Sequence, residues 1–168
     1  MSKDQTLILN TREIKQKLVR MAHEIHEAHY KEKELILIGV RGRGSEMATR
    51  LAKALGEVGE LNIVVEEIGL NKDKPLSAEM EYSGDVKMLK GKYVVLVDDV
   101  LNTGRTLIYA SRFLLMVELK GLAIATLIDR YHRKFPIRPD FVGLTLSTNL
   151  REHVYVDFSK GKEAVYLD

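Results

Sequence analysis

The chain has 168 residues, of which 45% are hydrophobic, and its formal net charge is +2. This length suits one globular domain with a sizeable core, so we expect a single domain over residues 1–168. Cysteine is absent, which excludes disulfides, thiolate metal sites and a cysteine nucleophile. No apolar stretch approaches the roughly eighteen residues that span a bilayer, so we expect a cytoplasmic protein without a membrane partner.

Helices and strands are predicted to alternate along the first half of the chain. A helix begins near Asn10, where Glu13 stands three residues later as a capping box requires, and it extends to about Tyr30. Residues 35–39 (LILIG) predict a short strand buried on both faces. A glycine-containing turn and a second helix follow, and residues 62–68 predict the next strand.

The segment from residue 71 to 91 has no sustained hydrophobic period and contains Pro75, two serines, two glycines and many charges. A structureless connection of this length is uncommon inside a compact domain and is usually a lid or a binding loop. We therefore expect a flexible lid over about residues 70–91.

The second half continues the alternation and ends in strands. A buried strand is predicted at residues 94–97 (VVLV), a helix at 106–118 and another strand at 122–128. Three strand-like runs follow, at residues 140–146, 153–158 and 164–167. Strands that alternate with helices predict an α/β fold with a mainly parallel, doubly wound sheet flanked by helices.

Three loops carry the unusual chemistry of this sequence, at residues 40–44, 98–106 and 129–138. In open parallel sheets ligands bind beyond the carboxyl ends of the strands. Each of these loops follows a predicted strand at that edge. The sequence therefore predicts that the three loops meet in one binding site.

The stretch VVLVDDVLNTGRTL (Val94 to Leu107) places Asp98 and Asp99 at the end of a buried strand and a polar turn directly after them. A glycine-containing turn that opens a helix binds phosphate through its free N–H groups and the helix dipole. The two carboxylates would repel phosphate, and they suit ribose hydroxyls or a hydrated magnesium ion. The alternative is an ordinary helix cap beside two solvent-exposed acids.

VVLVDDVLNTGRT closely resembles the signature by which type I phosphoribosyltransferases bind phosphoribosyl pyrophosphate (PRPP). The resemblance implies the fold of that family, with a lid loop and a small hood over a mainly parallel sheet. It also implies that Asp98 and Asp99 are catalytic and hold the ribose hydroxyls. The residues implied for the 5′-phosphate are Leu101, Asn102, Thr103, Gly104, Arg105 and Thr106.

The loop GVRGRG (Gly39 to Gly44) offers close backbone approach through its glycines and charged donors from Arg41 and Arg43. In the family the corresponding loop binds pyrophosphate. The resemblance therefore assigns this role to Val40, Arg41, Gly42 and Arg43, with Arg41 as a catalytic group.

The resemblance further implies Mg²⁺ as the cofactor, bound through PRPP with Asp98 or Asp99 as a ligand. The lid would close over PRPP and exclude water. Related enzymes carry an arginine in this lid, whereas this chain offers Lys72 and Lys74, which lack the bidentate fork of arginine. The five histidines show no paired spacing that demands a metal, and we expect His26 and His29 on the surface of the first helix.

The third loop is the candidate binding site for the nucleobase. HRKFPIRPDFVG (His132 to Gly143) resembles the loop of PyrR proteins, which are uracil phosphoribosyltransferases that also regulate the pyrimidine operon by binding its mRNA. That resemblance covers almost the whole chain and implies base contacts from Asp129, Ile137, Arg138, Phe141 and Val142. From periodicity alone, Phe141 is as well suited to the core as to stacking on a base.

A hypoxanthine-guanine phosphoribosyltransferase is the alternative, because it shares the letters PDFVG. Purine enzymes typically place a lysine donor where Asp129 stands here. A carboxylate accepts rather than donates, and it repels a carbonyl lone pair. Uracil is therefore favoured over a 6-oxopurine.

The basic cluster at residues 130–138 (RYHRKFPIR) is either a solvated loop or a nucleic-acid contact. The PyrR resemblance makes His23, Arg133 and Arg138 the candidate contacts to mRNA, although Val19 stands where that family's RNA face has a threonine donor. A non-catalytic RNA-binding regulator that senses UMP is thus a further alternative. The apolar face of the first helix and the resemblance predict a homodimer or a higher homo-oligomer.

Overall fold

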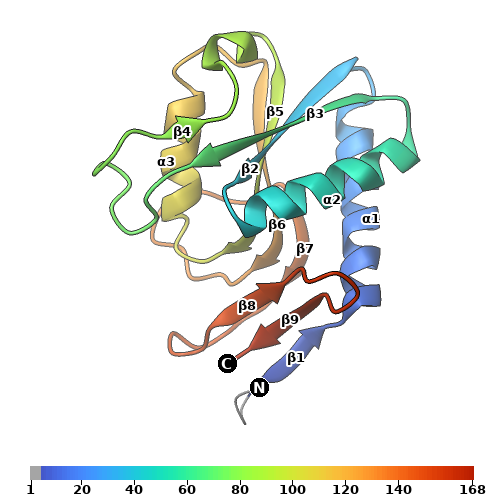
Figure 1. The fold of residues 1–168 in the computed structure, drawn as a ribbon, viewed down its shortest axis with the longest axis vertical. Coiled ribbons are helices and arrows are strands. Elements are labelled where there is room, and N and C mark those ends of the chain that lie inside the picture. Colours follow the sequence, from blue (N-terminus) through green and yellow to red (C-terminus); the bar gives the residue numbers. More distant parts are fainter. Residues whose placement is uncertain (1–4) are drawn as a thin grey trace.

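The computed structural model describes residues 5–168 and contains two sheets (Figure 1). The larger sheet has six strands in the order β4-β3-β2-β5-β6-β7, in which only the β3–β4 pair is antiparallel. The smaller is antiparallel, in the order β1-β9-β8. The elements are β1 (Thr6–Leu9), α1 (Thr11–His29), β2 (Glu34–Val40), α2 (Arg43–Val58), β3 (Asn62–Gly69), β4 (Glu81–Tyr82), the 3₁₀ helix η1 (Val86–Leu89), β5 (Tyr93–Leu101), α3 (Arg105–Leu114), β6 (Gly121–Asp129), β7 (Phe141–Thr145), β8 (Val154–Asp157) and β9 (Ala164–Leu167).

The large sheet is buried on both faces, which explains the continuous apolar runs of β2 and β5. Alternate residues of these strands point to opposite faces. Leu35 and Val95 pack with α1 and α2 on one face, whereas Ile36 and Val94 pack with α3 on the other. The predicted α/β architecture is confirmed.

Helix α1 begins at the predicted capping box. The Asn10 side chain accepts from Glu13 N at 3.0 Å, and the Glu13 carboxylate accepts from Asn10 N at 2.8 Å. At its other end the expectation of two surface histidines was wrong for His29. This ring is buried, its Nδ1 lies 2.8 Å from the Ile25 carbonyl oxygen, and it packs edge-on against Tyr93, because the last turn of α1 runs against the sheet.

The lid segment is partly structured, contrary to the expected structureless loop. Strand β4 pairs with the end of β3 through Ile68 with Tyr82 and Gly69 with Glu81, and η1 buries Leu89 in the core. Because both ends of the segment are attached to the sheet, only residues 70–80 form an open loop. Helix α3 also ends at Leu114, before the predicted residue 118.

The small sheet forms the predicted hood, and both ends of the described chain lie in it (Figure 1). Strand β1 pairs with β9 between Thr6 and Leu167, and β9 pairs with β8. Strand β1 was not predicted, because a four-residue strand this close to a helix cap shows too little periodicity. Within residues 5–168, no helix is long and apolar enough to cross a membrane.

Candidate active site

A cavity of about 180 Å³ lies at the carboxyl end of β5. Most of its wall is the continuous stretch from Asp98 to Leu107. Three residues from distant parts of the chain complete the wall, namely Arg43 at the start of α2, Lys72 in the lid and Val154 in the hood. The cavity therefore gathers the acid pair, the proposed phosphate loop, two cations and the hood at one place.

Asp98 and Asp99 lie inside β5, which continues to Leu101, and not beyond the strand end as expected. Both are buried, with 4% and 7% of their surfaces exposed. Burial raises the pKa of Asp98 well above its usual range, the neighbouring charge of Asp99 raises it further, and the Lys72 ammonium opposes the shift. Ligand groups that donate hydrogen bonds or carry positive charge would therefore be stabilised here.

The phosphate loop turns into α3 at Gly104, whose φ is 83°. A Cβ atom at this position would lie 2.5 Å from Cγ2 of Ile137, so only glycine fits. The loop at residues 129–138 is hydrogen-bonded to this turn. The Thr103 carbonyl accepts from Lys134 N at 2.8 Å and from Phe135 N at 3.2 Å. The first turn of α3 is thus held at the cavity wall, where Arg105 N donates to Oγ1 of Thr103 at 3.3 Å.

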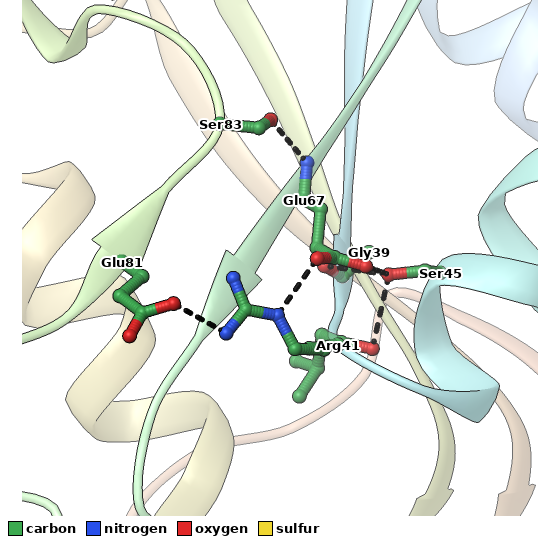
Figure 2. A network of polar contacts seen from close by, with 7 residues as sticks. Gly39, Arg41, Ser45, Glu67, Glu81 and Ser83 are labelled. Atoms are coloured by element: carbon green, nitrogen blue, oxygen red, sulfur yellow. Dashed lines mark hydrogen bonds and ion pairs between the residues drawn. The ribbon is translucent and has the colours of Figure 1, made fainter.

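Arg41 follows β2, yet its guanidinium does not line the cavity. Figure 2 shows it between two glutamates: Nε donates to Glu67 at 2.8 Å and Nη1 to Glu81 at 2.5 Å. The bond to Glu67 is the largest cause that raises the pKa of Arg41. Ser45 donates to the other oxygen of Glu67 at 2.7 Å, and Arg41 and Ser45 together lower the pKa of Glu67.

The proposed pyrophosphate loop lines the cavity through one residue. Of its predicted residues, Arg43 lines the cavity, whereas Val40, Arg41 and Gly42 do not. Glu81 belongs to β4, so Arg41 ties the loop after β2 to the base of the lid. Gly42, at φ 95°, makes the turn between β2 and α2.

Asp129 ends β6 and is buried, but its charge is compensated inside the protein. Its Oδ2 pairs with Arg133 Nη2 at 2.5 Å, and its Oδ1 accepts from Tyr131 N at 3.0 Å. The backbone at Tyr131 is left-handed, with φ 64°, which brings this N–H back to the carboxylate.

The other candidate base contacts are dispersed. Ile137 and Arg138 border a separate, open hollow of about 610 Å³, and neither lines the first cavity. The Phe141 ring is buried in the core beside His29, so it is not open for stacking on a base. The Val142 carbonyl accepts from an arginine of α1.

Two residues of this region had no assigned role from sequence. Arg130 was one charge among many in the basic cluster, whereas in the structure it is buried and bonded to Asn102 of the phosphate loop. Its position directly after a buried strand was the available signal. Val154 of the hood lines the cavity but is an unremarkable strand residue in the sequence.

The donor set suits a metal that arrives with phosphate oxygens. Within residues 5–168, no three histidine or acidic side chains gather into a metal site of their own. Mg²⁺ commonly binds through one or two carboxylates together with substrate phosphates and water. Asp98 and Asp99, buried at the cavity wall, fit that requirement.

The chain matches one protein family over most of its length. Residues 4–158 match the family described as the phosphoribosyl transferase domain. The bifunctional protein PyrR of Chloroflexus aurantiacus is 39% identical over 159 residues, which cover 89% of this chain and 86% of the relative. That of Macrococcus caseolyticus is 34% identical over 174 residues and covers 98% and 99%. The chain belongs to the PyrR family of phosphoribosyltransferases.

Solved structures of the same fold include more distant phosphoribosyltransferases. The hypoxanthine phosphoribosyltransferase of Trypanosoma cruzi has a TM-score of 0.79 at 18% identity and covers 96% of this chain and 95% of that one. A hypoxanthine-guanine enzyme of Bacillus anthracis has a TM-score of 0.70 at 20% identity, with coverages of 85% and 84%. These likenesses confirm the type I phosphoribosyltransferase fold.

The burial of Asp98 predicts a gain in stability when its charge is removed. Because its pKa is raised in the folded protein, the folded state keeps this proton to a higher pH than the unfolded chain, and stability falls as pH rises between the two pKa values. Asp98→Asn keeps an oxygen that accepts the 3.0 Å bond from Asp99 N. Without ligands at neutral pH we expect Tm to rise by about 2–4 °C, which corresponds to a gain of ~1 kcal/mol in the free energy of unfolding.

The measurement is thermal unfolding followed by circular dichroism across pH. The gain should vanish below about pH 4, where Asp98 is protonated in both states. Asp85→Asn is the matched control, because Asp85 is exposed and either side chain accepts the bond from Lys87 N. An unchanged or lower Tm of Asp98→Asn at neutral pH would contradict the predicted charge penalty.

Proposed function

We propose that this protein transfers phosphoribose from PRPP to uracil and forms UMP and pyrophosphate, with Mg²⁺ as cofactor, in the cytoplasm. The observation that carries this proposal is the shared cavity of Asp98, Asp99 and the phosphate loop. A buried acid pair beside the N-terminus of a helix suits a ribose diol and a 5′-phosphate on the same molecule. Membership of the PyrR family supports the same substrate.

In the proposed reaction N1 of uracil forms a bond with the anomeric carbon, the bond to the pyrophosphate oxygen breaks, and the N1 proton leaves. Positive charge develops on the ribose ring and negative charge on pyrophosphate. Asp98 and Asp99 would stabilise the former and hold the ribose hydroxyls. Magnesium, when bound, would supply charge neutralisation at the pyrophosphate.

The proposed pyrophosphate end is the side of the cavity that carries Arg43 and Lys72. The backbone of Val40 to Gly42 adjoins it in sequence. Arg41 remains a proposed catalytic group, but it would first have to release Glu67 and Glu81 to reach a ligand. Such a release would also free the lid base, so binding of pyrophosphate and lid position would be linked.

The identity of the base rests on the third loop. Both oxygens of Asp129 already accept internal bonds, and none of its neighbours in that network is a lysine that could donate to a 6-oxopurine. This supports uracil, as do the PyrR relatives. A hypoxanthine or guanine substrate is the alternative, because the fold is shared with enzymes that carry those names.

A base screen tests the reaction. Purified protein with PRPP and Mg²⁺ is offered uracil, hypoxanthine and guanine in turn, and pyrophosphate release and the nucleotide product are measured. We expect UMP from uracil. The rates with the purines should be at least about 100-fold lower, because a purine would leave buried polar groups of a uracil site unpaired. Turnover of the purines alone would overturn the uracil assignment.

The acid pair is tested in the same assay. Asp98→Asn combined with Asp99→Asn should lower kcat/KM by at least about 1,000-fold, because both carboxylates that would hold the ribose are lost. The fold should remain intact, as near-wild-type circular dichroism would demonstrate. Unchanged kinetics would contradict the assignment.

Lys72 is predicted to contribute to PRPP binding through its charge. It lines the cavity and opposes the rise in the pKa of Asp98, whereas Lys74 lies in the same lid but outside the cavity wall. Lys72→Ala should raise KM for PRPP about threefold to tenfold, as the loss of one solvent-exposed charged contact implies. Lys74→Ala is the matched control and should change KM by less than about twofold. Equal effects of the two substitutions would refute a specific role for Lys72.

RNA binding is proposed as a second activity on a different surface, and the family membership supports it. His23 and Arg138 are exposed, whereas Arg133 is paired with Asp129. The proposed RNA contact is therefore His23 with Arg138. A homodimer or higher oligomer is proposed with it.

A gel-shift with a pyrimidine-operon leader RNA, with and without UMP, tests this activity. We expect a shift that UMP strengthens and that Arg138→Ala weakens about tenfold, because a basic contact to RNA is lost. Lys160→Ala, at an exposed lysine of the hood, is the control for general charge. No shift at low salt would remove RNA regulation and also the alternative of a non-catalytic regulator.

A further inference from the structure

Arg130 is a buried cation whose hydrogen bonds go to neutral oxygens. It follows β6 and is 6% exposed. Burial lowers its pKa, which reflects the free energy needed to keep a guanidinium away from water. Such a group is tolerated only when its donors are satisfied in a fixed arrangement.

The four acceptors come from the phosphate loop and from the connection between β7 and β8. Nη1 donates to Oδ1 of Asn102 at 2.8 Å. Nε donates to Oγ1 of Thr148 at 3.0 Å, and Nη2 donates to the carbonyls of Asn149 at 3.3 Å and Glu152 at 2.5 Å. Asn102 belongs to the phosphate loop, whereas residues 148–152 form the hood connection that leads into β8.

One of the four acceptors lies in the wall of the binding cavity, and the other three precede a second wall residue in the sequence. Asn102 lines it directly, and the hood connection leads to Val154, which also lines it. Arg130 itself is not a lining residue. The Arg130 backbone adds a bond from its N–H to the Leu101 carbonyl at 3.0 Å, next to Asn102.

A guanidinium is planar, and its donors point in fixed directions. Moving the phosphate loop away from the hood connection would therefore leave a buried charged donor without a partner, which is strongly unfavourable. The position of Asn102 and the position of residues 148–152 are thus linked through one side chain.

We propose that Arg130 is a positioning residue that sets the phosphate loop for PRPP through Asn102 and couples that loop to the hood. The inference rests on the proposed binding of PRPP in this cavity. It assigns Arg130 no contact with substrate and no part in RNA binding. Its effect on PRPP is transmitted through the amide of Asn102.

A double-mutant cycle on PRPP binding tests the coupling. Isothermal titration calorimetry with PRPP and Mg²⁺, without any nucleobase, is applied to the full chain, Arg130→Lys, Asn102→Ala and the double variant. Lysine keeps the charge but lacks the fork, so Arg130→Lys should weaken PRPP binding about tenfold or more. In the Asn102→Ala background the same substitution should change the affinity by less than about twofold, because the path through Asn102 is already lost.

Thr148→Val provides a second cycle in case Arg130→Lys does not fold. It removes an acceptor of Arg130 on the hood side and leaves the cavity wall unchanged. We expect PRPP binding to weaken about threefold to tenfold, and this effect should also disappear in the Asn102→Ala background. Circular dichroism and Tm of each variant establish that folded protein is compared.

Arg50→Lys is the matched control. Arg50 donates to the Phe158 carbonyl in the hood at 2.7 Å, but it neither lines the cavity nor contacts Asn102. Its PRPP affinity should stay within about twofold of wild type. An equal loss in Arg50→Lys would show that any loosening of the hood suffices, and would overturn the specific role of Arg130.

The outcomes separate this inference from the proposed function. If wild type binds PRPP and the effects of Arg130→Lys and Thr148→Val persist undiminished without Asn102, the positioning role is overturned while the proposed function stands. If wild type does not bind PRPP, the proposed function fails, and the inference fails with it. Loss of both effects in the Asn102→Ala background supports the inference.

Discussion

The structure is organised around two adjacent carboxylates inside its central strand. Asp98 and Asp99 lie in β5, which is flanked by β2 and β6 in a sheet covered on both faces. Burying such a pair is unfavourable, and the strand opens there onto a cavity with Arg43 and Lys72 in its wall. The pair thus lowers stability at a place where hydroxyl groups of a ligand or a bound cation would restore it.

The buried charges of this protein are compensated in different ways, and the difference points to the site. Asp129 is neutralised by Arg133, and Arg130 is satisfied by neutral oxygens. Asp98 accepts a bond from the backbone of Asp99, but burial and the charge of Asp99 keep its pKa well above the usual range. A compensated buried charge organises the protein itself, whereas an uncompensated one beside a cavity marks where a ligand acts.

Much of the fold could be predicted from the sequence, because the strands of the large sheet are continuous apolar runs. Each of the three loops with candidate site residues follows one of these strands. That the stretch from Asp98 to Thr106 forms one side of a candidate site was also predicted, since its acids, turn and helix start are contiguous. The partners of Arg41 were not predictable, because Glu67 and Glu81 come from a distant strand and from a segment without periodicity. The burial of His29 and the hydrogen bonds of Arg130 likewise depend on packing between elements far apart in sequence.

The hood has a consequence for how the protein folds. Its strand β1 comes from the first residues described and pairs with β9, which comes from the last, so Thr6 lies opposite Leu167. Closing so long a loop is slow, because the chain must be ordered before the contact stabilises it. All strands of the large sheet precede β8 in the chain. On the ribosome, the sheet with its acid pair can therefore form first, and the wall that contains Val154 closes only once synthesis has reached β9.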